Sequence, residues 1–206
     1  MMRAVLSVVA ALGFTSSVAA QPASQRAGAK PQGFDKLCER EMVRASHKHG
    51  VPLGMLYAVG LTETGRGDSL RPFALNVDGK AVYELSKPAA MQAFGVATKQ
   101  GAKFIDVGCM QINHKYHGKH FASLEHMLDP AINVDYAARF LAELKQREGT
   151  WTKAVARYHA GPDNDPAQKR YVCRVISNMV ATGFGKWTPE SEKFCSVRVV
   201  NGKASK

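Results

Sequence analysis

The sequence lacks several patterns that identify common classes of protein. No Cys-x-x-C pair occurs among its 206 residues, which argues against a thioredoxin-type redox site. No His-Glu-x-x-His motif accompanies its seven histidines, so a zinc site is not expected and the histidines are assigned to a basic surface. No segment carries a dense stripe of Lys and Arg, and no second long apolar run follows the N-terminal one. These absences argue against nucleic-acid binding and leave a domain that is expected to need no metal or cofactor.

The first 20 residues have the organisation of a signal peptide. Arg3 supplies a positive charge, residues 4–13 are mostly apolar, and Val18-Ala19-Ala20 provides the small residues that a signal peptidase reads. The apolar run is short for a membrane span. We therefore expect cleavage after Ala20 and no stable membrane span afterwards, with an uncleaved anchor as the alternative. Residues 21–34 are rich in Pro, Gly, Ala, Ser and Gln and are predicted to form a flexible linker.

The net charge and the cysteines limit the partners and the compartment. A formal net charge of +11 suits an anionic partner. Export argues against nucleic acid, so anionic lipid or an anionic wall polymer remains, with an unspecialised basic surface as the alternative. An exported chain enters an oxidising compartment, where its four cysteines are expected to form disulfides. They allow three pairings, and the sequence does not choose among them. The cysteines are Cys38, Cys109, Cys173 and Cys195.

Helix signals dominate the chain after the linker. Apolar periodicity, N-cap residues and terminal glycines predict helices over residues 35–49, 52–63, 86–100, 130–148, 151–159 and 165–182, with a short helix after Ser123. The turn signal Asp78-Gly79, between apolar residues that alternate, predicts one small β-hairpin. Residues 104–118 (FIDVGCMQINHKYHG) are expected to be irregular. The predicted fold is mainly α with one hairpin, in a single domain over residues 35–183 with a C-terminal extension over 184–206.

A single carboxylate ends the most apolar of these helices. Residues 51–61 carry almost only hydrocarbon, and Glu63 falls on the same helical face as Leu56 and Val59. The carboxylate is therefore either solvated where the helix reaches the surface or held against an apolar wall. In the second environment it loses solvation and keeps its proton to higher pH, as a general acid must.

Three short motifs follow one another where helices are expected to end: TETG (62–65), GCMQIN (108–113) and ARYHAG (156–161). Together they resemble the catalytic domain of the soluble lytic transglycosylases, relatives of goose-type lysozyme, over about residues 38–179. The hairpin region and GCMQIN are most similar to the branch that opens the cell wall for conjugation and secretion machines. The resemblance implies a lysozyme-like fold in the periplasm that cleaves the β-1,4 bond between N-acetylmuramic acid and N-acetylglucosamine in peptidoglycan.

The same resemblance implies a mechanism and a set of site residues. In that family one Glu acts as acid and then as base, the sugar's own 6-hydroxyl attacks, and the product carries a 1,6-anhydro ring. Glu63 stands at the position of this acid. The expected substrate-binding residues are Thr64, Met110, Gln111, Asn113, Tyr158 and His159. Met110 is expected to pack under the site, and Tyr158 to point its hydroxyl towards the acid; Tyr171 matches a later family tyrosine.

The resemblance implies no metal and no cofactor. The expected partners are the glycan strands and an envelope-spanning secretion, conjugation or flagellar assembly. Three residues depart from the family pattern: Thr64 replaces a Ser but keeps its hydroxyl, Cys109 replaces a Leu, and His159 replaces an Asn. His159 is expected to add a second titrating group near the acid.

Two other functions remain open at this point. If Asp106 faced Glu63 across a bound water, the two carboxylates would favour a lysozyme-like hydrolase. A non-catalytic module that binds the wall would account for the charge and the linker, but it has no use for Glu63. The products released from peptidoglycan distinguish the three functions.

Overall fold

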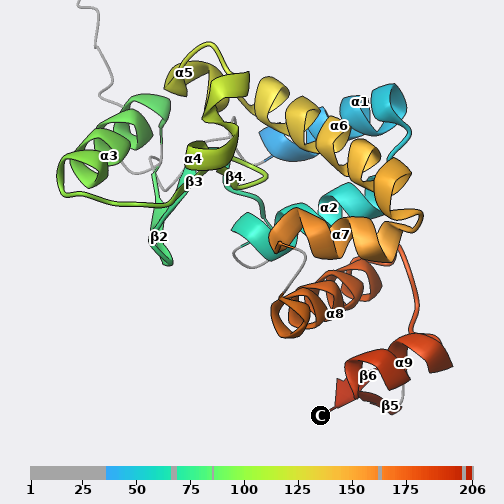
Figure 1. The fold of residues 1–206 in the computed structure, drawn as a ribbon. Coiled ribbons are helices and arrows are strands. Elements are labelled where there is room, and N and C mark those ends of the chain that lie inside the picture. The colour runs from blue at the N-terminus through green and yellow to red at the C-terminus, as the bar shows by residue number, and fades with distance from the viewer. Residues whose placement is uncertain (1–35, 66–68, 85, 162–163, 201–202, 206) are drawn as a thin grey trace, which may run out of the picture. The chain divides into compact units, whose positions relative to one another are not determined.

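The structure is a computed structural model that describes residues 36–65, 69–84, 86–161, 164–200 and 203–205, all within one unit of the chain, residues 33–206. These residues contain nine α-helices, one 3-10 helix and six strands (Figure 1). In chain order the elements are α1 (Leu37–His49), α2 (Leu53–Thr64), β1 (Ala74–Val77), β2 (Lys80–Tyr83), α3 (Lys87–Lys99), β3 (Ile105–Val107), β4 (Ile112–Asn113), α4 (His114–His117), η1 (Gly118–His120), α5 (Leu124–Met127), α6 (Pro130–Glu148), α7 (Trp151–His159), α8 (Asp165–Ala181), α9 (Pro189–Cys195), β5 (Arg198–Val200) and β6 (Lys203–Ser205).

Two predictions concern residues that lie outside this description. The signal peptide over 1–20 and the linker over 21–34 both belong to the N-terminal part, so they stay predictions, as do the domain boundaries at 35 and 183. Within the described residues, no helix combines the length and the apolar character that a membrane span requires.

Helices α1 and α2 pack against each other. Gly50, in the left-handed conformation with φ of 67°, ends α1, and Pro52 immediately precedes α2. Both boundaries agree with the sequence prediction. A Cβ at Gly60 would lie 2.5 Å from Cε of Met42, so this glycine allows α2 to pack closely against α1. The apolar residues of α2 are therefore buried in the core.

The predicted hairpin is present and is part of a larger sheet. Strands β1 and β2 pair antiparallel around Asp78 and Gly79, whose φ values of 48° and 89° suit a tight hairpin turn. β1 also pairs with β3, and β3 pairs with β4, which gives the order β2-β1-β3-β4. The prediction that residues 104–118 are irregular is wrong. They form β3, a tight turn, β4 and α4.

Capping residues define the helices of the second half of the chain. Asp129 accepts hydrogen bonds from the first backbone N–H groups of α6, with Pro130 at the first helical position, as predicted. The predicted apolar stripe of α6 is buried throughout. Helix α8 begins one residue earlier than its Asp-Pro signal suggests, because Asn164 rather than Asp165 is the N-cap. The disulfide Cys173–Cys195 joins α8 to α9.

The core lies where α1, α2, α6, α7 and α8 pack together, and it continues under the four-stranded sheet. Figure 1 shows the sheet and α3 to one side of these helices, with the last turn of α2 directed towards the sheet. The prediction of a mainly α, lysozyme-like fold is confirmed. The largest fully buried side chains are Tyr171, Met42, Leu56, Leu70, Leu75, Met110, Met127, Leu128, Leu141 and Leu144.

Candidate active site

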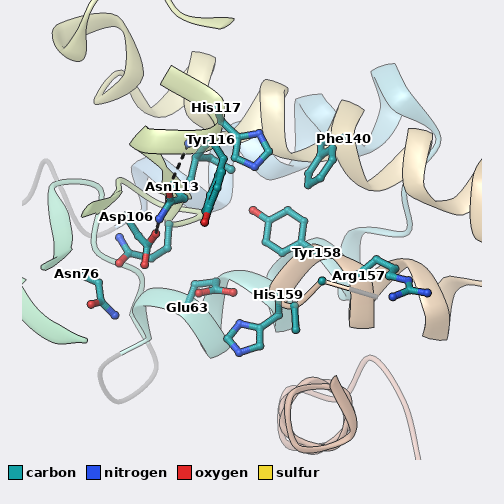
Figure 2. A pocket seen from close by; sticks show the side chains of 14 residues that line it. Glu63, Asn76, Asp106, Asn113, Tyr116, His117, Phe140, Arg157, Tyr158 and His159 are labelled. Carbon is teal, nitrogen blue, oxygen red and sulfur yellow. Dashed lines mark hydrogen bonds between the residues drawn. The ribbon is translucent and has the colours of Figure 1, made fainter. Parts of the chain in front are cut away.

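A cavity of about 540 Å³ lies between the end of α2, the sheet and α7. Polar and aromatic side chains from distant parts of the sequence face it (Figure 2). Its lining consists of Glu63, Asn76, Asp106, Gln111, Ile112, Asn113, Tyr116, His117, Phe140, Arg157, Tyr158, His159, Ala160 and Gly161. Two carboxyl groups, several amides and several aromatic rings thus surround one space, which is the lining expected for a carbohydrate site.

Glu63 stands in the last turn of α2 with its carboxyl group at the cavity wall. The hydroxyl of Tyr171 donates a hydrogen bond of 2.6 Å to its Oε1. Loss of solvation raises the pKa of Glu63 from 4.5 to about 7; the Tyr171 hydrogen bond opposes this rise, and the charge of Asp106 adds to it. The group therefore keeps its proton close to neutral pH and can also release it there.

The turn between β3 and β4 presents the second motif to the cavity. Gln111 has a φ of 45°, a left-handed conformation that is uncommon outside glycine. Its side-chain Nε2 donates to the carbonyl oxygens of Ala74, at 3.1 Å, and Gly108, at 3.0 Å. Gly108 itself has a φ of 79°. The amide nitrogen of Gln111 thus ties the turn to β1 and fixes the rest of the side chain at the cavity.

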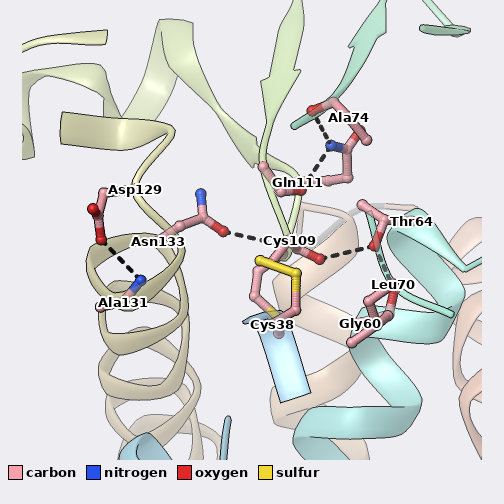
Figure 3. The surroundings of a disulfide bond; sticks show 12 residues. Cys38, Gly60, Thr64, Leu70, Ala74, Cys109, Gln111, Asp129, Ala131 and Asn133 are labelled. Carbon is pink, nitrogen blue, oxygen red and sulfur yellow. Dashed lines mark hydrogen bonds between the residues drawn. A yellow bond between two sulfur atoms is a disulfide. The ribbon is translucent and has the colours of Figure 1, made fainter. Parts of the chain in front are cut away.

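A buried asparagine holds the same turn from behind (Figure 3). Asn133 of α6 is fully buried; its Nδ2 donates to the carbonyls of Val107 and Met127, and its Oδ1 accepts the N–H of Met110 at 2.9 Å. A Cβ on Gly108 would lie 2.7 Å from this Nδ2. A buried amide with all of these bonds specifies one geometry, since leaving any partner unpaired is costly.

Thr64 and a disulfide fix the turn on the α2 side. The hydroxyl of Thr64 is buried and donates to the carbonyl of Cys109 at 3.1 Å. Cys109 is bonded to Cys38 in α1, and both residues are fully buried. The hydroxyl retained at position 64 therefore connects the helix that carries the acid to the motif opposite it. The pairing left open by the sequence is Cys38–Cys109 and Cys173–Cys195.

Asp106 is the second carboxylate of the cavity. Nδ2 of Asn113 donates to its Oδ1 at 2.7 Å. Burial raises the pKa of Asp106 above its usual range, while this hydrogen bond acts in the opposite direction. Oδ1 of Asn113 accepts the backbone N–H of Tyr116 at the start of α4. Asn113 is thus held between the carboxylate and the helix, on the wall that faces Glu63 (Figure 2).

The aromatic residues around the acid differ from the expected arrangement. The hydroxyl of Tyr158 donates to the carbonyl of Met110 at 2.8 Å, whereas Tyr171 is the tyrosine that donates to Glu63. The ring of His159 stacks on that of Tyr171, with 4.2 Å between centroids and 4° between planes. Burial and nearby arginines lower the pKa of His159, so its imidazole is neutral at neutral pH.

The structure brings most of the predicted site residues together. Glu63, Gln111, Asn113, Tyr158 and His159 all line the cavity. Thr64 and Met110 do not: their side chains are 1% and 0% exposed and lie beneath the lining, where they support the turn. Sequence reasoning missed other side chains that line the cavity, and these include Asn76, Tyr116, Phe140, Arg157 and His117, the last of which the sequence assigns to a basic surface.

No group of three His, Cys, Asp or Glu side chains that could hold a metal ion is found in the part of the chain that the structure describes. The several histidines of α4, η1 and α5 instead contact aromatic rings, as His117 does with Tyr136 and Phe140.

A helical domain with a small sheet, and a partly buried acid in a cleft between them, is typical of the lysozyme-like class of glycan-cleaving domains. Comparison with models of protein families gives one match, the Transglycosylase SLT domain, over residues 42–175. The match covers more than half of the chain, so the chain belongs to this family. Domains of the family are lytic transglycosylases that act on peptidoglycan, typically outside the cytoplasm. No curated protein and no solved structure matches the chain.

Proposed function

We propose that the protein is a peptidoglycan lytic transglycosylase that cleaves the β-1,4 bond between N-acetylmuramic acid and N-acetylglucosamine and leaves a 1,6-anhydro ring. The environment of Glu63 is the observation that supports this proposal. Its carboxyl group is in a cavity, its pKa is about 7, and one of its oxygens is held by Tyr171. An acid of this kind can give up a proton and take one back within a single turnover at neutral pH.

The proposed reaction uses this one group twice. Protonated Glu63 gives its proton to the glycosidic oxygen as the bond from that oxygen to C1 of the muramic acid breaks. The resulting carboxylate takes the proton of the sugar's 6-hydroxyl while O6 bonds to C1, with help from the N-acetyl group. Glu63 ends protonated, no water is consumed, and the attacking oxygen belongs to the substrate, which lowers the entropic cost of attack.

The neighbouring residues support the two roles of Glu63 and hold the sugar. Tyr171 stabilises the carboxylate form, and its bond to Oε1 leaves Oε2 for the substrate. Gln111 is fixed through its side-chain nitrogen, which leaves its oxygen available to the sugar, whereas Asn113 is fixed through its nitrogen by Asp106 and through its oxygen by the N–H of Tyr116. Such preorganised groups suit recognition of the sugar's N-acetyl and hydroxyl groups. Tyr158 and His159 form the opposite wall.

A hydrolase remains the second candidate because Asp106 lines the same cavity and acts on the Glu63 charge. Hydrolysis would require Asp106 to activate a water or attack C1, and its hydrogen bond with Asn113 occupies one of its oxygens. A purely binding module is the third candidate, and the raised pKa of Glu63 argues against it.

Mass spectrometry of the muropeptides released from purified peptidoglycan decides among these candidates. We expect 1,6-anhydro products from the wild-type protein, none from Glu63→Gln, and the same anhydro products from Asp106→Asn. Products with a reducing end, lost in Asp106→Asn, would establish the hydrolase. Binding without release of any product by the wild-type protein would establish the binding module.

We also infer that the protein works in the periplasm, in service of an envelope-spanning secretion, conjugation or flagellar assembly. Two disulfides and the signal-like residues 1–20 support export. The inferred assembly rests on the resemblance of the hairpin region and of GCMQIN alone. Cell fractionation tests the first inference, because recovery of the full-length chain in the cytoplasm would contradict export; deletion of the gene, followed by assays for secretion, conjugation and motility, tests the second.

A further inference from the structure

A second hollow of about 620 Å³ lies on the outer side of α8, and it shares His159 with the catalytic cavity. His159 therefore borders both spaces, with its ring stacked on that of Tyr171. The lining of the second hollow, called here the basic groove, consists of His159, Ala167, Lys169, Arg170, Cys173, Arg174, Ser177, Cys195, Ser196 and Val197.

The charged side chains that line the basic groove are all positive. Lys169, Arg170 and Arg174 are exposed along one side of α8, and the described residues that line the groove include no acidic one. None of the three cations takes part in a salt bridge with another described residue. Two of them instead approach aromatic rings, Lys169 that of Phe194 and Arg174 that of Tyr171. A concave surface with three such cations attracts an anionic ligand.

The wall of the groove opposite α8 comes from residues beyond the family match. The match ends at residue 175, whereas Cys195 ends α9 and Ser196 and Val197 follow it. The Cys173–Cys195 disulfide and the contact of Lys169 with Phe194 hold this segment against α8. The C-terminal extension therefore completes the groove, and the groove is a feature added to the family domain.

We propose that the basic groove binds the carboxylates of the peptide stem that peptidoglycan carries on its muramic acid. This inference rests on the proposed function. Because the groove and the catalytic cavity share His159 in their linings, an anion in the groove lies close to the proposed cleavage site, and the charged part of the same substrate molecule is the ligand that fits. The sugar rings are uncharged, and the peptide stem, which branches from the muramic acid beside the cleaved bond, supplies several free carboxylates.

The test measures binding rather than cleavage. The protein used is the Glu63→Gln variant, because it leaves the strands intact. Its affinity is measured with two kinds of fluorescently labelled, uncrosslinked strands. One kind keeps its peptide stems, and the other has been stripped of them by an amidase. We expect tighter binding of the strands with stems. Addition of Arg170→Gln lowers this preference by roughly two- to fivefold, the range for one partly exposed ion pair, and added salt lowers it further.

Lys99→Gln is the matched control, because it removes one exposed cation at the end of α3, outside the basic groove. It should leave the preference unchanged. Arg174 is not substituted, since it also lies over the ring of Tyr171, on which the cavity residue His159 stacks. A double Cys173→Ser, Cys195→Ser variant releases the extension and should lose the preference to a similar degree, with circular dichroism reporting that the helical domain remains folded.

Several outcomes would overturn the inference. They are equal affinity for both kinds of strand, no binding of either, or an Arg170→Gln effect of the same size on both. Each of these leaves the transglycosylase proposal intact if the wild-type protein still releases anhydro products. Conversely, products without an anhydro ring would refute the proposed chemistry, while a preference for peptide stems that depends on Arg170 would still support the groove.

Discussion

Replacing Glu63 with Gln should abolish cleavage and at the same time stabilise the protein above neutral pH. The folded state holds the carboxyl at a pKa of about 7 instead of 4.5, mainly because it is desolvated. Below pH 4.5 the acid is protonated in both folded and unfolded chains, and the substitution costs or gains little. Between pH 4.5 and 7 only the unfolded chain loses the proton, so the wild-type free energy of unfolding falls as pH rises. Above pH 7 the accumulated loss is about 3 kcal/mol.

The assay is urea unfolding of the wild type and of Glu63→Gln, followed by circular dichroism at a series of pH values from acid to alkaline. The quantity of interest is the difference between the two free energies of unfolding at each pH, because contributions from all other groups cancel. We expect the free energy of unfolding of the variant to rise relative to that of the wild type between pH 4.5 and 7. Above pH 7 the difference between the two should stay constant. Turbidity clearing of purified peptidoglycan in the same samples should disappear in the variant at every pH.

The control is Glu143→Gln, which removes an exposed carboxylate on α6. Its free energy of unfolding should follow the wild type without a comparable divergence. If the Glu63→Gln and wild-type curves also ran parallel across the whole range, Glu63 would ionise as a solvated group, and the proposed role as a proton carrier would be refuted.

Three further predictions follow from the contacts around the acid and the turn. Tyr171→Phe removes a hydrogen bond that favours the charged form of Glu63, so the alkaline limb of the pH profile of kcat/KM should move to higher pH; an unmoved limb would contradict the role given to this bond. Joint replacement of Cys38 and Cys109 by Ser should lower the free energy of unfolding by about 4 kcal/mol, measured in denaturant, because the bond closes a loop of 71 residues. Asn133→Ala leaves a buried N–H and two carbonyls unpaired and should cost about 3 kcal/mol or more in the same measurement, whereas a loss below 1 kcal/mol would show that water replaces the amide.

The helices were predictable because their signals are local. A cap such as Asp129 and a terminal glycine such as Gly149 act within one helical turn, and the apolar stripe between them repeats at a fixed spacing. Strands β3 and β4 contain only three and two residues, too few to show an alternating pattern. They exist because β3 pairs with β1, which lies about 30 residues earlier in the chain, and a short sequence window does not contain that information.

The site was predictable to the extent that its residues belong to contiguous motifs. Glu63 and Gln111 could be assigned in this way. The bond between Glu63 and Tyr171 spans 108 positions, and the burial of Thr64 depends on how α2 packs against the turn. Asn133 lies in a helix with no feature in its sequence that distinguishes it from a surface asparagine. Its importance follows from tertiary packing alone.

The Cys38–Cys109 bond has a consequence for the timing of maturation. The turn that faces the acid is covalently linked only after Cys38 and Cys109 have both been synthesised and brought together by folding. An oxidant must then remove the hydrogens of the two thiols. A newly made chain in a reducing environment holds that turn by hydrogen bonds alone. Under the proposed export, this oxidation step delays full assembly of the site until the chain has left the compartment of its synthesis and has reached the one that holds the proposed substrate.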